Sequence, residues 1–217
     1  MKKKLLKIVL GALVILLCCG GLAQAVPITI QITGNITSVG GYTEAIPSTI
    51  HAGVTFTGIY TYDSATPDSD SSVHRGVYQR NSPYGISIVV GGYEFKTAPN
   101  HVNQFKMLIT NDDPVNGVHD YYTVLGYQNI SIPSIGFEVE YISWKLGDST
   151  HSVLSSDALP ATVPVLTDWN SNVLKIGGLY GPNLSGLSIY GTVTQVTPEP
   201  LTGILMIMGM LFVRRKR

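Results

Sequence analysis

Apolar and polar side chains alternate with a period of two along most of this 217-residue chain. Residues 26–36, with the sequence VPITIQITGNI, put Ile28, Ile30 and Ile32 on one side and mostly polar residues on the other. Residues 54–62 repeat this pattern. Because successive side chains of a strand point to opposite faces of a sheet, the alternation predicts strands with one buried face and one wet face.

Further segments have the length and composition of short strands, with turn-forming residues between them. They are residues 76–80, 85–90, 93–97, 104–110, 121–127, 136–145, 173–176 and 187–196. Gly91-Gly92, between two of them, has the length of a two-residue hairpin connection. Many short strands with little helical periodicity predict an all-β fold, a single antiparallel β-sandwich or jelly roll that covers residues 26–196.

Residues 1–25 have the three parts of a secretory signal peptide. Four lysines precede an apolar stretch over residues 8–19, and small residues follow at Ala23 and Ala25, the two positions that signal peptidase inspects. The pattern predicts export through the Sec machinery and a mature chain that begins near Val26. The chain's two cysteines, Cys18 and Cys19, lie in this segment, so the exported domain has neither a disulfide nor a thiolate metal site.

Residues 197–217 consist of three unlike parts in a fixed order. Pro198, Glu199 and Pro200 come first, an apolar run over residues 201–213 follows, and a basic end closes the chain: Arg214, Arg215, Lys216 and Arg217. As a helix the apolar run is about 20 Å long, which is short for a membrane span. Cations next to such a span stay in the cytoplasm, which predicts a short transmembrane helix with residues 26–197 outside.

This C-terminal arrangement resembles the PEP-CTERM sorting signal of Gram-negative bacteria that make exopolysaccharide. The resemblance covers about twenty residues. It implies that exosortase, a membrane-embedded enzyme, recognises Pro198, Glu199 and Pro200, with residues 201–213 as the membrane segment and the basic end as the stop. It also implies an inner-membrane intermediate, followed by delivery to the cell surface or the extracellular matrix.

The exported domain is acidic, although the whole chain has a formal net charge of zero. Eight of the 14 lysines and arginines lie in the two terminal segments, whereas only one of the 14 acidic residues, Glu199, does so. The domain therefore keeps six cations and 13 acids, a net charge of −7 with neutral histidines. This sign of charge disfavours nucleic acid as a partner, since phosphate binding requires cations.

A loop rich in oxygen ligands contains Asp63, Asp68 and Asp70 together with several serines. Such loops can hold calcium outside the cell. The alternative is a solvated turn, because Asp and Ser favour turns and the EF-hand spacing is absent. No other cofactor is indicated, and the five histidines form no zinc-binding pattern.

The sequence predicts a protein that is not an enzyme. Glu138 and Glu140 lie two apart on one predicted strand, as expected of a polar outer face, whereas glycosidase carboxylates usually come from different strands. No G-x-S-x-G motif is present. Twelve tyrosines, Trp144 and Trp169 could stack on sugar rings, although strands favour aromatic residues in any case.

These observations leave three hypotheses about function. The first is a structural or adhesive role within exopolysaccharide or biofilm at the cell surface or in the extracellular matrix. The second is a carbohydrate-binding module that acts through surface aromatics, with Trp144 and Trp169 as the residues to test. The third is a secreted hydrolase, which would need carboxylate or serine groups that converge in one pocket.

Overall fold

The computed structural model describes residues 27–41, 46–99, 104–114, 119–180 and 185–199. It contains ten strands: β1 (Pro27–Gly41), β2 (Thr55–Asp63), β3 (Arg75–Arg80), β4 (Gly85–Val90), β5 (Tyr93–Lys96), β6 (Phe105–Thr110), β7 (Asp120–Tyr127), β8 (Phe137–Asp148), β9 (Ser171–Tyr180) and β10 (Ser185–Pro198). Two short 3-10 helices, η2 (Pro133–Ile135) and η3 (Leu166–Asp168), are the only helices in the described part of the chain.

The predicted strands are all present, and the predicted all-β antiparallel class is confirmed. Gly91 and Gly92 form the predicted hairpin turn between β4 and β5, both with positive φ, at 59° and 87°. The largest differences are in β1, β8 and β9, which extend beyond the segments that alternation marked. The predicted signal peptide and the predicted C-terminal helix lie outside the described residues.

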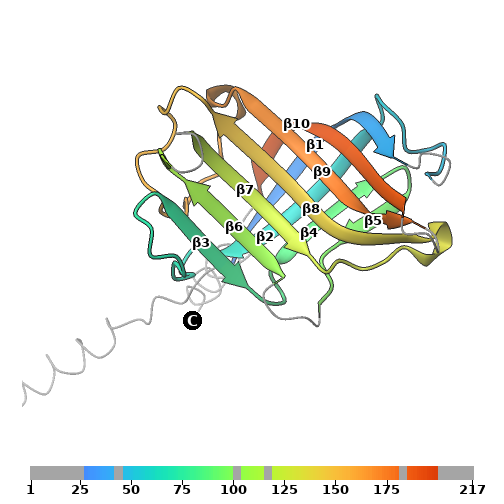
Figure 1. Cartoon of the computed structure of the whole chain (residues 1–217), viewed down its shortest axis with the longest axis horizontal. Coiled ribbons are helices and arrows are strands. Elements are labelled where there is room, and N and C mark those ends of the chain that lie inside the picture. Colours follow the sequence, from blue (N-terminus) through green and yellow to red (C-terminus); the bar gives the residue numbers. More distant parts are fainter. Residues whose placement is uncertain (1–26, 42–45, 100–103, 115–118, 181–184, 200–217) are drawn as a thin grey trace, which may run out of the picture.

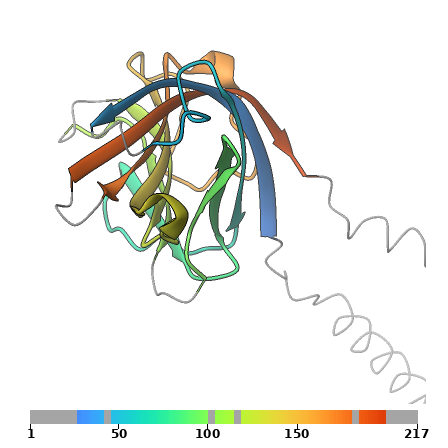
Figure 2. The same ribbon diagram turned by 90° about the vertical axis from the view of Figure 1, so that its right-hand side faces the viewer.

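All ten strands belong to one hydrogen-bonded sheet with the order β3-β6-β7-β8-β9-β10-β1-β2-β4-β5. The sheet curls until its two halves face each other, as the end-on view in Figure 2 shows. In Figure 1, β3, β6, β7, β8 and β9 form the near layer, and β2 and β4 lie behind it. The arrangement packs like a sandwich, but both layers come from a single sheet rather than from two.

Large aromatic side chains fill the space between the two layers. Tyr60 of β2 meets Trp144 of β8 with ring centroids 5.8 Å apart, and Phe95 of β5 meets Phe137 of β8 at 6.1 Å. The hydroxyls of Tyr60 and Tyr122 are hydrogen-bonded to each other at 2.9 Å, which partners two buried polar groups. Burial raises the pKa of both tyrosines well above the usual value.

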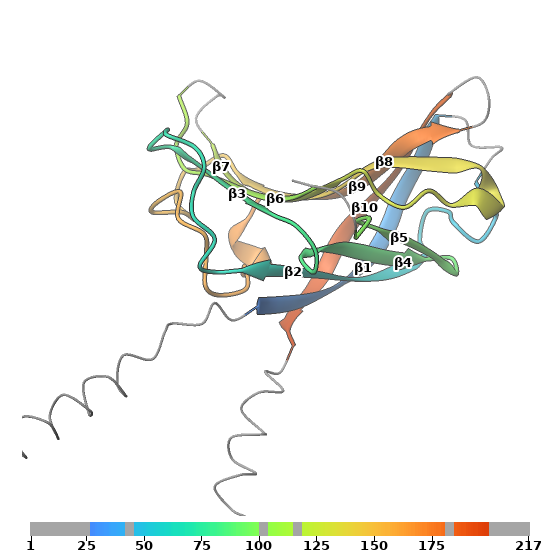
Figure 3. The same ribbon diagram turned by 90° about the horizontal axis from the view of Figure 1, so that it is seen from below.

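The strands β1 and β10 are long and carry the sheet from one layer into the other (Figure 3). The register of their pairing shifts between Thr33 and Gly34, and again between Ile36 and Ser38. Such irregularities bend a strand pair. A Cβ at Gly34 would lie 2.1 Å from the carbonyl oxygen of Thr192 and 2.5 Å from the Phe56 ring, so the close approach at this bend requires glycine.

Candidate binding face

The outer side of β6, β7, β8, β9 and β10 carries an ordered row of side chains. Lys106, Leu125, Ser143, Lys175 and Tyr190 are direct cross-strand partners in that order, one from each strand. Their chain neighbours on the five strands are buried, so the row points away from the core. This side of the sheet is toward the viewer in Figure 1.

Two tyrosines beside this row lie across glycines of the next strand. Tyr141 is the cross-strand partner of Gly177, and a Cβ at that glycine would be 2.3 to 2.6 Å from atoms of the Tyr141 ring. Tyr121 is the partner of Gly147, where a Cβ would be 3.0 Å from its ring. Because these glycines have no side chain, the rings lie against the sheet surface.

Each lysine of this side lies near a tyrosine ring. The Lys145 Nζ is 3.5 Å from the Tyr121 centroid, and the Lys106 Nζ is 5.6 Å from the Tyr127 centroid. Distances below about 6 Å are typical of cation–π contacts. We call Lys106, Tyr121, Tyr127, Tyr141, Lys145, Lys175 and Tyr190 the tyrosine–lysine face.

Lys175 lies between two tyrosines of this face. Its Nζ is 5.1 Å from the Tyr141 centroid and 5.3 Å from the Tyr190 centroid. Hydrogen bonding to the Tyr141 hydroxyl is the main effect that raises the pKa of Lys175, with a smaller effect from Tyr190 and partial burial acting in the opposite direction. The ammonium group is therefore a cation at neutral pH, and it lies between the two rings.

The tryptophans named as surface aromatics are in fact core residues, so that assignment was wrong. Trp144 is 0% exposed and Trp169 is 9% exposed. Trp144 also donates its indole N–H to the Asn172 Oδ1 at 3.0 Å. Alternation could have shown this, since Trp144 is in phase with the buried Ile142 and Leu146. The aromatics available to a ligand on this side are tyrosines, of which Tyr127 is 42% exposed.

The three aspartates of the predicted calcium loop organise their own loop. Asp63 binds Arg80 at 3.0 Å, and Asp68 accepts the backbone N–H of Val77 at 2.8 Å on β3, an edge strand. Asp70 binds Arg75 at 2.7 Å. Among the residues that the structure describes, no group of three or more acidic, histidine or cysteine side chains could hold a metal ion. Calcium binding at this loop stays a prediction.

Two histidines that are distant in sequence meet where one loop leads into β7 and another follows β8. The rings of His119 and His151 stack at 5.6 Å with an interplanar angle of 7°. The His151 Nδ1 is 3.0 Å from the Asp112 Oδ1, and both His151 and Asp112 have positive φ. Sequence spacing gave no sign of this pair, because residues 119 and 151 belong to different loops.

The predicted sorting motif lies partly in the described chain. Pro198 ends β10 opposite Ile30 of β1, and the Glu199 backbone N–H donates to the Thr29 carbonyl at 2.9 Å. The Gln31 side chain donates to the Glu199 carboxylate at 2.9 Å. The other predicted processing residues lie outside the described residues: Ala23, Ala25, Pro200, Arg214, Arg215, Lys216 and Arg217.

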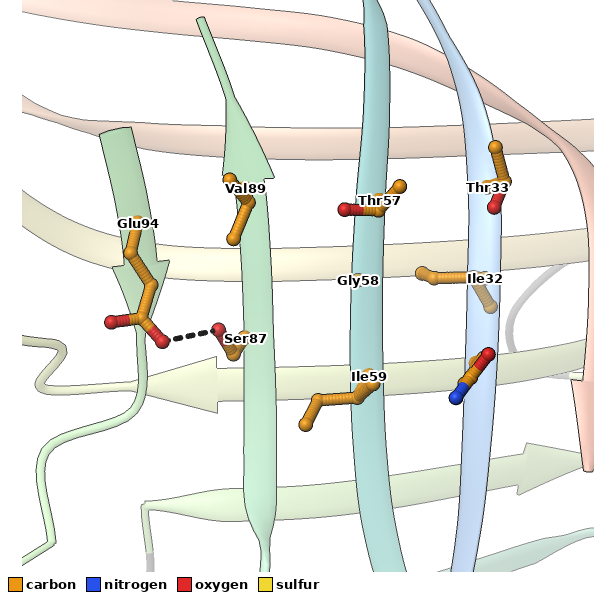
Figure 4. Close-up of a pocket in the computed structure, with 9 residues that line it drawn as sticks. Ile32, Thr33, Thr57, Gly58, Ile59, Ser87, Val89 and Glu94 are labelled. Carbon is orange, nitrogen blue, oxygen red and sulfur yellow. Dashed lines mark hydrogen bonds between the residues drawn. The ribbon is translucent and has the colours of Figure 1, made fainter. Parts of the chain in front are cut away.

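The opposite outer side, on β1, β2, β4 and β5, has a shallow hollow of about 360 Å³ (Figure 4). Ile59 and Val89 are 44% and 42% exposed there. Ser87 donates to the Glu94 carboxylate at 3.0 Å, and Lys96 binds the same carboxylate at 2.6 Å, which lowers the pKa of Glu94. The side chains that line this hollow include no aromatic ring, so the tyrosine–lysine face is the better candidate for sugar stacking.

Comparison of the chain with protein-family models, with curated proteins and with solved structures gave no match. Within the described residues, no helix has the length and apolar character needed to cross a membrane.

Proposed function

We propose that this protein is an exported, non-enzymatic β-domain of a Gram-negative bacterium that binds exopolysaccharide at the cell surface or in the extracellular matrix. The binding surface in this proposal is the tyrosine–lysine face. The structural or adhesive role and the carbohydrate-binding role then become one function, because attachment to the polysaccharide is what makes the domain part of the matrix.

The arrangement of Tyr141, Lys175 and Tyr190 carries the proposal. The Tyr141 ring of β8 lies against Gly177 of β9. Lys175, also on β9, lies between this ring and Tyr190 of β10. Aromatic rings have an apolar face that suits the C–H side of a pyranose, and tyrosine also offers a hydroxyl for hydrogen bonding to sugar hydroxyls. Three adjacent strands of one sheet, β8, β9 and β10, support these side chains, so little ordering is needed when a ligand binds.

The route of export is the second part of the proposal. The precursor in this route has three parts: the signal peptide over residues 1–25, the curled-sheet β-domain over residues 26–196 and the sorting signal over residues 197–217 with its short transmembrane helix. Signal peptidase, the Sec machinery and exosortase are the partners in this route. Glu199 donates its backbone N–H to Thr29 and accepts a hydrogen bond from the Gln31 side chain, which supports a motif that begins at the end of the last strand.

The binding proposal is tested by replacing Tyr141 and Tyr190 together with alanine. Loss of about 0.5–1.5 kcal/mol per ring predicts binding that is weaker by about fivefold to 150-fold. The measurement is affinity electrophoresis of the purified domain in gels that contain exopolysaccharide from the producing bacterium. Equal mobility of the variant and the native domain at every polysaccharide concentration would exclude this face as the binding site.

The matched control is the double replacement Ile59→Ala and Val89→Ala on the opposite outer side. Both side chains are about as exposed as Tyr127, so the control removes apolar surface without touching the tyrosine–lysine face. We expect its retardation in the gel to equal that of the native domain. A thermal unfolding curve for each variant establishes that it is folded.

A further inference from the structure

The six cations of the exported domain fall into two groups, three that pair with acids and three that contact tyrosines. Arg75, Arg80 and Lys96 each bind a carboxylate, at 2.7, 3.0 and 2.6 Å. The other three cations, Lys106, Lys145 and Lys175, all lie on the tyrosine–lysine face and contact rings instead. In the described part of the chain, no ion pair joins these three lysines to an acid.

Acidic side chains near the face are either buried or lie at the end of the face where β8 begins. Asp120 and Asp148 are 0% and 2% exposed and accept hydrogen bonds from the loop that follows β8. Glu138 and Glu140 are exposed near the start of β8, next to Tyr141. The middle of the face, around Lys145 and Lys175, is therefore a local positive region on a domain with a net negative charge.

We propose that the ligand of this face is an acidic polysaccharide, whose carboxylate or sulfate groups contact the lysines while its sugar rings stack on the tyrosines. This inference rests on the proposed function and specifies the substrate class. The row from Lys106 to Tyr190 crosses five strands, about 19 Å at a strand spacing of about 4.8 Å. A polysaccharide chain that lies across the strands meets first Lys106 and then Lys175 with Tyr190.

The net charge of the domain opposes the approach of a polyanion but does not prevent contact at the face. At physiological ionic strength the field of a surface charge is screened within about 8 Å. The distance from Lys175 to the acids of the β2–β3 loop spans several strands, since β9 and β3 are separated by β6, β7 and β8. The nearby lysines therefore dominate the electrostatic interaction at the face. A neutral polysaccharide would make no ionic contact with them.

The test replaces Lys175 with methionine, which keeps an apolar stem between the two rings and removes the charge. Three polymers serve as probes in affinity electrophoresis: alginate as a polyuronate, dextran sulfate as a sulfated glycan and dextran as a neutral glycan. We expect the native domain to be retarded by at least one acidic polymer and not by dextran. The Lys175→Met variant should bind that polymer about tenfold more weakly, and Lys175→Arg should bind it nearly as well as the native domain.

Lys96→Met is the control for a general loss of charge, because Lys96 is paired with Glu94 on the opposite outer side. We expect its binding to equal that of the native domain, whereas an equal loss in both methionine variants would overturn the inference. The probe that retards the domain identifies a carboxylate or a sulfate as the anion. Binding to dextran that depends on Tyr141 and Tyr190 but not on Lys175 would overturn the inference and leave the proposed function standing. If neither these probes nor the native exopolysaccharide bind, both are overturned.

Discussion

Asp148, the last residue of β8, holds together the loop that follows it. Its carboxylate accepts the backbone N–H groups of Thr150 and Ser152, both at 2.9 Å, and the side-chain amide of Asn170 at 3.1 Å. Hydrogen bonds from the Ser152 and Thr150 backbone lower the pKa of Asp148 to about 2. The ionised carboxylate is thus a structural element of this end of the sheet.

The low pKa of Asp148 predicts how stability depends on pH. Because the pKa is lower in the folded state than in the unfolded state, the stabilisation is present above about pH 4, the ordinary value for aspartate, and is lost as the pH falls toward 2. Urea unfolding midpoints measured between pH 6 and pH 2 test this prediction. Below pH 4 the midpoint of the native domain should fall more steeply with decreasing pH than the midpoint of Asp148→Asn. About the same fall in both proteins would contradict the prediction.

Individual residues differ in how far the sequence reveals their position. Trp144 could be assigned to the core, since alternation puts it in phase with Ile142 and Leu146. The stacking of His119 on His151 could not be predicted, because it depends on where two loops end in space. The contact of Lys175 with Tyr190 depends in the same way on the register between β9 and β10.

The bend in β1 and β10 is the element that turns a flat sheet into a two-layered domain. Gly34 and Gly191 both lie there, and Phe56 packs against them, since a Cβ at either glycine would be within 3.0 Å of its ring. The alternation of apolar and polar residues predicted that these strands exist, but it did not predict the bend. β1 continues to Gly41 because residues 38–41 pair with residues 187–190 of β10, a contact between distant parts of the chain.

The replacement Gly34→Ala tests the role of this bend. The new Cβ would lie 2.1 Å from the Thr192 carbonyl oxygen, so the strands must separate, and we expect a loss of about 1–3 kcal/mol in the free energy of unfolding. Gly40→Ala, on the same strand with no atom within 4 Å of its Cβ, should change the free energy by less than about 0.5 kcal/mol. Chemical denaturation measures both, and equal effects would show that the close approach at Gly34 is unimportant.

At the scale of the whole molecule, the sequence predicted an all-β antiparallel domain but not the strand order. β3, the third strand in the chain, pairs with β6 at one edge, and β1 lies between β10 and β2 near the middle of the sheet. These pairings join residues that are far apart in the chain. Tyr141, Lys175 and Tyr190 come together through other pairings, those of the consecutive strands β8, β9 and β10, and which of their residues meet depends on a register that the sequence did not reveal.

The central proposal, that this domain is exported and retained in a polysaccharide matrix, is tested most directly by intact mass spectrometry of the protein in fractions of the producing bacterium. We predict that the protein occurs in the extracellular matrix fraction with a mass that begins near Val26 and ends between Pro198 and Pro200. A full-length chain that stays in the cytoplasm of cells that contain exosortase would contradict the proposal.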